Sequence, residues 1–110
     1  FHAACQEYVE AATFLHYINK EELLPIAKLD VSEEDYLAGL CDLTGELARR
    51  SVILASKKKK SDVERIRAFV DELFGSFLRF DFRNGELRKK SDQIKWNLKR
   101  IEEVWYDLSR

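Results

Sequence analysis

The sequence contains few of the residues that interrupt helices. Only four glycines and one proline occur in 110 residues, whereas hydrophobic residues make up 45% and charged residues 35% of the chain. So little glycine and proline allows few turns, which is typical of a helical protein. The length suits one domain with one modest core. We therefore predict an all-α protein, an antiparallel bundle of four long helices, with residues 1–110 forming a single domain.

Other absences limit the chemistry that the chain can perform. No apolar run reaches the roughly 18 residues that span a bilayer, and no signal peptide is visible. Cys5 and Cys41 lie far apart without metal-ligand spacing, so we interpret both as small buried residues in a reducing compartment. The absence of a Cys/His cluster disfavours zinc, and no Gly-rich phosphate loop or nucleophile elbow occurs. His16 is interpreted as a packed residue. We expect a soluble, intracellular protein.

The sequence begins at Phe1, which already belongs to a helical pattern and is not an initiator methionine. We therefore expect a C-terminal portion of a longer subunit, without its N-terminal helices. The formal net charge of −1 gives no overall attraction to nucleic acid, so a polyanion site would have to be a local patch.

Hydrophobic periodicity and capping signals predict the four helices. The first spans residues 1–19 and is followed by a connector with Pro25. Ser32 and Asp35 form a capping box at the start of the second helix, and Ser61 and Glu64 form another at the start of the third. We expect the third helix to stop at a turn formed by Asn84 and Gly85, and the last to span residues 86–109. The apolar stripe predicted for the first helix comprises Phe1, Ala4, Cys5, Tyr8, Ala11, Ala12, Leu15 and Ile18.

Two pairs of carboxylates occupy helical spacings. Asp42 and Glu46 lie four residues apart on one face, with Gly45 expected to leave room for a close approach, and Glu7 and Glu10 lie three apart on the first helix. A like-charged pair costs a helix a few tenths of a kcal/mol. Four carboxylates from two helices would suit Mg²⁺ or Mn²⁺, which prefer oxygen ligands. Such a site could support metal-assisted phosphodiester hydrolysis. For Glu46 alone, a surface salt bridge with Arg49 or Arg50 is an alternative.

Basic residues are concentrated near the last helix. Seven occur between residues 83 and 100, and we take five of them as candidate nucleic-acid contacts: Arg88, Lys89, Lys90, Lys95 and Lys99. The alternative is that they only increase solubility. Four lysines at residues 57–60 are expected to form a solvated loop, with a nucleic-acid contact as the minority interpretation. Trp96 lies off the apolar stripe of its helix, as an exposed interface residue would.

Three segments resemble the translin superfamily: Gln-Glu-Tyr-Val-Glu-Ala at residues 6–11, residues 35–37 with Asp-Leu-Thr-Gly-Glu-Leu at 42–47, and Ile-Glu-Glu-Val-Trp-Tyr-Asp-Leu at 101–108. The first two are most similar to the translin-associated factor X (TRAX) type, whereas residues 84–110 are closer to translin. The resemblance implies a subunit of seven helices that assembles into barrel-like octamers. A homologue encoded by a single gene, which assembles with itself, also fits.

The TRAX type is the catalytic subunit of a Mg²⁺-dependent endoribonuclease formed with translin. The resemblance thus implies cleavage of single-stranded RNA, in passenger-strand removal during RNA silencing and in processing of tRNA-precursor fragments, in the cytoplasm and nucleus. It assigns catalysis and metal binding to Glu7, Glu10, Asp42 and Glu46. The alternative is a non-catalytic, translin-like subunit that binds single-stranded RNA or DNA and serves assembly. A purely structural helical bundle is a third possibility.

Overall fold

The computed structural model describes residues 1–83 and 85–110, and this part of the chain contains four long helices. These are α1 (His2–Lys20), α2 (Glu33–Ser56), α3 (Lys60–Phe77) and α4 (Gly85–Ser109), with a short 3₁₀ helix, η1 (Ile26–Lys28), between α1 and α2. The predicted all-α fold is confirmed. None of the helices in the described residues combines the length and the apolar character needed to cross a membrane.

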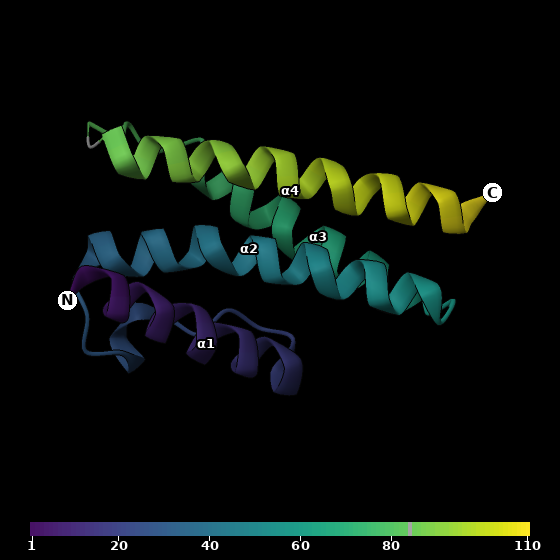
Figure 1. Cartoon of the computed structure of the whole chain (residues 1–110), viewed down its shortest axis with the longest axis horizontal. Coiled ribbons are helices and arrows are strands. Elements are labelled where there is room, and N and C mark those ends of the chain that lie inside the picture. Colours follow the sequence, from purple (N-terminus) through teal and green to yellow (C-terminus); the bar gives the residue numbers. More distant parts are fainter. Residues whose placement is uncertain (84) are drawn as a thin grey trace.

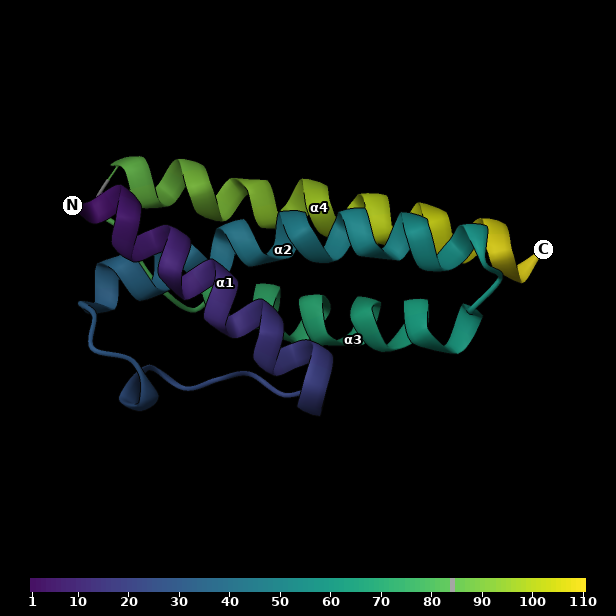
Figure 2. The ribbon, with the colours of Figure 1, turned by 60° about the horizontal axis from the view of Figure 1, so that its bottom comes forward.

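Helix α2 is the centre of the bundle and packs against all three other helices. Figure 1 shows α2 between α1 and α4, with α3 behind them. In Figure 2 the molecule is turned, so that α3 is seen alongside α2 and α4 while α1 crosses α2 obliquely. The core lies between these helices, and each side chain of this size contributes about 1.5–3 kcal/mol when fully buried. Its fully buried aliphatic residues are Val9, Leu43, Leu47, Val63, Ile66, Val70, Ile94 and Ile101.

Helix α1 packs through a face different from the predicted stripe. Its buried residues are Val9, Thr13 and Tyr17, whereas Tyr8 and Leu15 of the predicted stripe are 51% and 61% exposed. The reason lies on α2, where a Cβ atom at Gly39 would stand only 2.5 Å from the Cβ atom of Val9. The missing side chain lets Val9 reach the α2 backbone, so the helices meet on the Val9 side. The predicted stripe, which also includes the exposed Phe1, was therefore wrong as the core face.

The helices do not approach each other closely at Gly45, so the room that it was expected to leave beside the carboxylates stays a prediction. A Cβ atom there would lie 3.7 Å from Asn97 Nδ2, which is an ordinary contact. Periodicity places both glycines on α2 but does not tell which one lies at a helix crossing. Gly39 is the glycine that the packing requires.

Helix α2 begins directly after its predicted N-cap, whereas both ends of α3 differ from the prediction. The Asp35 amide donates to Ser32 Oγ at 3.1 Å, as predicted for the first capping box. Helix α3 begins one residue before Ser61, and Lys59 at its N-cap position makes no side-chain cap. The tight turn between α2 and α3, with Lys58 in the left-handed region at φ 59°, brings the chain into helical geometry before Ser61.

Helix α3 ends at Phe77, before the aromatic residues expected to continue it. The rings of Phe80 and Phe82 instead pack near Phe77 and stack on each other, with centroids 5.7 Å apart. These ring contacts with Phe77 are made by the non-helical chain that follows α3, although Phe80 itself stays 55% exposed. The predicted turn includes Asn84, which lies outside the described residues. Gly85 is the first residue of α4 and not the residue that stops α3.

The two cysteines differ in environment. Cys41 is buried, and that burial raises the pKa of its thiol to about 12, so it is an inert packing residue at neutral pH. Cys5 is only half-buried. The prediction of a buried, unreactive cysteine is thus confirmed for Cys41, whereas Cys5 lies nearer to the surface.

Candidate acidic site between α1 and α2

The structure brings carboxylates of α1 and α2 close enough to interact. Burial raises the pKa of Glu10 above its ordinary value of 4.5, and repulsion from Asp42, Glu46 and, more weakly, Glu7 adds to this shift. Arg49 opposes it. Glu10 is half-buried and Glu7 is exposed. The four residues that the sequence singled out therefore lie in one region of negative charge on the packed α1–α2 pair, which we call the acidic site.

Asp42 has a partner that its sequence neighbourhood does not predict. Lys90 of α4 donates to both carboxylate oxygens, with Nζ at 3.0 Å from Oδ1 and 3.2 Å from Oδ2. About a third of each side chain remains exposed. The two residues are 48 positions apart, so only the packing of α4 on α2 brings them together. Lys90 thereby neutralises one of the four carboxylates.

Glu46 forms an ion pair with Arg49, one turn further along α2. The sequence had offered this as an alternative for Glu46, with Arg49 or Arg50 as the partner. Both side chains are exposed, and pairs of this kind contribute under about 1 kcal/mol. The pair leaves Glu46 available for other ligands at little cost.

The donor set of the acidic site fits a hard divalent cation in its chemistry. All its ligand atoms would be carboxylate oxygens, the type that Mg²⁺ prefers. Burial is the largest cause of the raised pKa of Glu10, and repulsion from the Asp42 and Glu46 carboxylates adds to it. In the arrangement of residues 1–83 and 85–110, however, no three or more His, Cys, Asp or Glu side chains converge as a metal site. Lys90 holds the carboxylate of Asp42. A metal ion at Asp42 therefore requires Lys90 to move.

The five predicted nucleic-acid contacts do not share one face of α4. Lys90 reaches α2, and Asn97 on the same side donates from Nδ2 to Thr44 Oγ1 at 2.9 Å. At about 100° per residue, the other four positions point elsewhere. Those lying on the side away from Lys90 are Arg88, Lys95 and Lys99, whereas Lys89 lies between the two sides. Of these five residues, Lys90 is the one that contacts a carboxylate of the acidic site.

The far side of α4 carries a small surface of basic and aromatic residues. Trp96 is 58% exposed, which confirms the exposure expected for it. The ammonium groups of Lys95 and Lys99 lie 5.8 Å and 5.7 Å from its ring centroid. An exposed indole between two cations can stack on a nucleobase while the lysines contact phosphates. We call Lys95, Trp96 and Lys99 the tryptophan surface.

Sequence reasoning missed a polar contact that fixes the start of α1. Asp35 is buried, and its carboxylate accepts from Gln6 Nε2 at 3.1 Å and lies 3.0 Å from His2 Nδ1. The hydrogen bond with His2 is the largest cause that holds the pKa of Asp35 below its ordinary value of 3.8, and the hydrogen bond with Gln6 is the next. The capping role assigned to Asp35 explains its amide, but its side chain ties α1 to α2. No local signal reveals this, because the partners lie 29 and 33 residues away.

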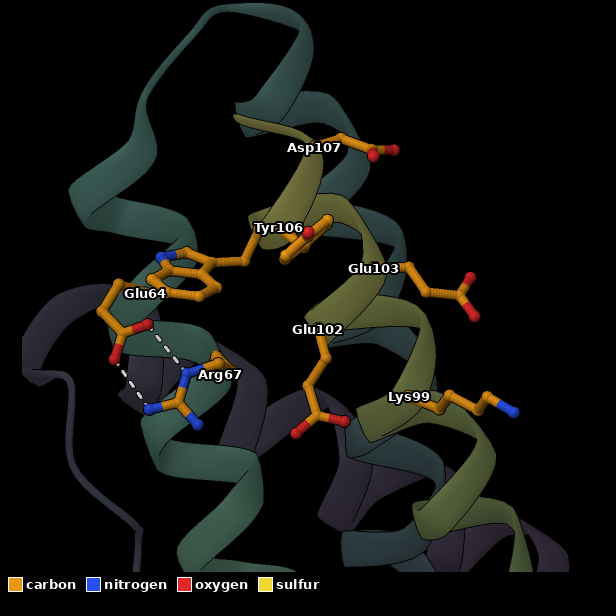
Figure 3. Close-up of a pocket in the computed structure, with 8 residues that line it drawn as sticks. Glu64, Arg67, Lys99, Glu102, Glu103, Tyr106 and Asp107 are labelled. Carbon is orange, nitrogen blue, oxygen red and sulfur yellow. Dashed lines mark hydrogen bonds and ion pairs between the residues drawn. The ribbon is translucent and has the colours of Figure 1, made fainter. Parts of the chain in front are cut away.

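A separate hollow of about 610 Å³ lies between α3 and α4. Figure 3 shows Glu64 and Arg67 of α3 joined by two hydrogen bonds, with Glu102, Glu103 and Lys99 along α4. The Arg67 guanidinium also lies 5.9 Å from the ring centroid of Trp105, which lines the hollow. None of the four carboxylates of the acidic site lines it. Glu64 and Arg67 form an ion pair across its α3 wall, and its lining presents no nucleophile with an adjacent base.

Comparison with known proteins places this helical bundle in a family. The model of the Translin family matches residues 1–109, nearly the whole chain. The chain belongs to the translin family. Translin from Homo sapiens is 37% identical over 116 residues, which cover 99% of this chain and 50% of that protein. Translin from Gallus gallus is 43% identical over 76 residues, covering 69% of this chain and 33% of that protein.

Two further relatives carry names linked to other members of the family. The Translin-associated protein X homolog of Schizosaccharomyces pombe is 27% identical over 118 residues, covering 96% of this chain and 51% of that protein. The crystal structure of apo-NeC3PO matches with a TM-score of 0.91 and 25% identity, over 97% of this chain and 57% of that chain. The chain spans about half the length of the curated relatives it matches. The family resemblance of the sequence is confirmed, while its TRAX-type assignment stays a prediction.

Proposed function

We propose that this chain is part of the catalytic subunit of a Mg²⁺-dependent endoribonuclease that cleaves single-stranded RNA. The observation that carries the proposal is the position of Glu10 near carboxylates of a second helix: burial raises the pKa of Glu10 most, and repulsion from Asp42 and Glu46 raises it further. Folding has placed like charges together where each adds an electrostatic cost, and a bound cation would offset that cost. Active sites commonly contain such perturbed carboxylates. The S. pombe relative named as a Translin-associated protein X homolog supports the catalytic type.

Each carboxylate has a different environment and hence a different proposed role. Asp42, Glu46 and Glu7 would hold Mg²⁺ (or Mn²⁺) through their carboxylate oxygens. When bound, the ion would polarise the phosphodiester and make a water molecule more acidic. Glu10, whose raised pKa brings it closer to neutral pH, is the carboxyl suited to accept the proton of the attacking water.

Substrate binding would use two surfaces of α4. The tryptophan surface offers an indole for base stacking between the ammonium groups of Lys95 and Lys99. Arg88 lies on the same side of the helix, and Lys89 and Lys90 lie nearer the acidic site. We further propose that the chain works in a hetero-octamer with a translin-type subunit, or in a self-assembled oligomer, within the cytoplasm and nucleus. Its substrates would include passenger strands in RNA silencing and tRNA-precursor fragments.

Replacing Glu7 or Asp42 by alanine in the full-length assembly tests the catalytic proposal. Cleavage of a labelled single-stranded RNA with Mg²⁺ should fall by about 10² or more, the usual contribution of a positioned acid–base or metal-binding group. Glu103→Ala, which removes a carboxylate from the surface of α4 outside the acidic site, is the matched control and should retain activity. Undiminished cleavage by the Glu7 and Asp42 variants would contradict the proposal.

A non-catalytic role in binding and assembly is the second candidate. It is favoured by the relatives named Translin, which are 37% and 43% identical, and by the neutralisation of Asp42 by Lys90. This function predicts that single-stranded RNA or DNA binds with a steep dependence on salt. It also predicts no turnover with Mg²⁺ or Mn²⁺. Cleavage that requires Glu7 and Asp42 distinguishes the first candidate from the second.

A further inference from the structure

Four consecutive lysines, at residues 57–60, connect α2 to α3, and we call them the lysine turn. We propose that the lysine turn binds the phosphate backbone of single-stranded nucleic acid, away from the acidic site and without a metal ion. Figure 1 shows this turn at the end of the bundle that also holds the C-terminus. The last residue of α2, Ser56, lies about 15 Å along that helix from Glu46. The inference rests on the nucleic-acid binding that both candidate functions share.

The positive charge of the lysine turn is not compensated by nearby carboxylates. All four side chains are exposed. The acids closest in sequence have other partners, since Asp62 pairs with Arg65 and Glu64 pairs with Arg67. Within residues 1–83 and 85–110, no carboxylate forms an ion pair with a lysine of the turn. In a chain of net charge −1, the turn is therefore a local site of unpaired positive charge.

The position of the lysine turn costs stability that a solvated loop does not require. Lys59 lies at the N-cap position of α3 and makes no side-chain cap, and Lys60 is the first residue of that helix. Both stand at the positive end of the helix dipole, where acidic and capping residues are favoured. The Lys58 amide donates to the Ala55 carbonyl at 2.9 Å and the Lys59 amide to the Leu54 carbonyl at 3.0 Å, so the turn has a defined shape. A bound phosphate would offset the repulsion.

A hollow of about 650 Å³ adjoins the lysine turn. Its lining residues are Lys58, Lys59, Lys60, Ser61, Asp62, Glu64 and Trp105. The Lys60 ammonium lies 5.9 Å from the ring centroid of Trp105. Surfaces that bind single strands combine lysines along the backbone with an aromatic ring beside them, whereas an acidic peptide needs only the cations. The combination therefore favours a nucleic-acid strand, with phosphates on the lysines and a sugar or base in the hollow.

Binding of a fluorescein-labelled oligouridylate to the full-length assembly, measured by fluorescence anisotropy in EDTA at increasing KCl, tests the lysine turn. EDTA removes divalent ions, so neither cleavage nor a metal site affects the result. Lys58→Gln/Lys59→Gln should weaken binding and reduce the slope of log K against log[KCl] by about 1.4, or about 0.7 for each lost contact with a single strand. Lys58→Arg/Lys59→Arg keeps the charge and should retain the wild-type slope. The matched control for overall charge is Lys20→Gln/Lys28→Gln, which replaces two exposed lysines outside the turn.

Two further measurements separate binding from a structural role. In urea unfolding, Lys58→Gln/Lys59→Gln should be at least as stable as the wild type, because it removes repulsion; lower stability with an unchanged salt dependence would show that the lysines are only structural. In the wild type, bound oligouridylate should protect Lys58 and Lys59 from acetylation by sulfosuccinimidyl acetate more than Lys20 and Lys28, as measured by mass spectrometry. This footprint needs no variant, so it decides the question even if the glutamine variant does not fold.

The outcomes separate this inference from the function on which it rests. If the wild type binds no single-stranded nucleic acid, both candidate functions and this inference fail. If it binds but Lys58→Gln/Lys59→Gln changes the salt dependence no more than Lys20→Gln/Lys28→Gln does, only the inference fails. An oligoglutamate peptide that displaces the RNA as effectively as unlabelled oligouridylate of equal charge would assign the turn to acidic protein segments and would also overturn the inference.

Discussion

At the scale of single residues, Glu10 shows most directly how the fold creates chemistry that the sequence only suggests. In an isolated helix its carboxyl would titrate near its ordinary pKa. In the bundle, burial and the carboxylates of α2 raise that pKa. Glu7, three residues away on the same helix, contributes least to this rise in pKa. The pair across the two helices therefore matters more for Glu10 than the pair along one helix.

Replacing Glu10 by glutamine should stabilise the metal-free protein at neutral pH. The folded state holds the Glu10 proton more tightly than the unfolded state, so wild-type stability falls as pH rises from 4.5 through the raised pKa of the folded state. The Glu10→Gln variant does not lose this stability. The excess of its free energy of unfolding over that of the wild type should be complete above the raised pKa of Glu10 and absent below pH 4.5. Urea unfolding of the full-length protein between pH 3 and 8 measures the difference.

Glu103→Gln is the control for this series, because it removes a carboxylate outside the acidic site. The free energy of unfolding of Glu103→Gln, relative to the wild type, should not rise with pH as that of Glu10→Gln does. A Glu10→Gln protein that is less stable than the wild type at pH 7 would show that the Glu10 carboxylate is favourably paired and not repelled. Saturating Mg²⁺ should remove the advantage of Glu10→Gln, because the cation compensates the charge that the variant eliminates.

At the scale of elements, one glycine decides how α1 and α2 cross. Val9 is fully buried, and Gly39 leaves the space that its Cβ atom needs. The buried Asp35 then ties the start of α1 to α2 through His2 and Gln6. The acidic site depends on this crossing, because it sets which side of α1 faces the carboxylates of α2.

The two glycines of α2 provide a matched test of that crossing. Gly39→Ala would place its Cβ atom 2.5 Å from Val9 and should lower the free energy of unfolding by about 1–3 kcal/mol. Gly45→Ala meets Asn97 at an ordinary 3.7 Å and should raise it by up to about 1 kcal/mol, because alanine is the better helix former. Denaturant unfolding of the full-length protein measures both. Equal effects at the two positions would contradict the crossing described above.

At the scale of the whole molecule, the outer side of α1 remains without cover from the described residues. Tyr8 and Leu15, two turns apart, are 51% and 61% exposed. Among the aromatic rings of residues 69–82, Phe69 packs on Tyr17 and Phe77 is buried, whereas Phe80 is 55% exposed. The surface that lacks a partner is therefore on α1 more than on α3.

We expect the 110-residue chain by itself not to behave as a stable monomer. Apolar residues at a spacing of seven on one helix favour packing against another helix. Sedimentation velocity should show association, and the double substitution of Tyr8 and Leu15 by lysine should reduce it. Tyr106→Lys, at an exposed position of α4, is the control. A soluble monomer with one cooperative unfolding transition would contradict this expectation.

The sequence by itself determined the fold class and the candidate carboxylates. Helical periodicity, scarce glycine and proline, and the Ser32 cap are local signals, so they predicted four helices and the start of α2 correctly. Local spacing also singled out Glu7, Glu10, Asp42 and Glu46. It could not settle the buried face of α1, because the packing of Val9 on α2 depends on Gly39, some 30 residues away.

Only the tertiary structure decided which groups meet. The Lys90–Asp42 pair and the Asp35 contacts with α1 join residues that lie 29 to 48 positions apart. The separation of the basic residues of α4 into one side near the acidic site and another around Trp96 likewise depends on how α4 packs on α2. Such contacts carry no local signal, because they depend on the crossing and rotation of whole helices. The interplay of Lys90 with the acidic site is thus a property of the packed bundle.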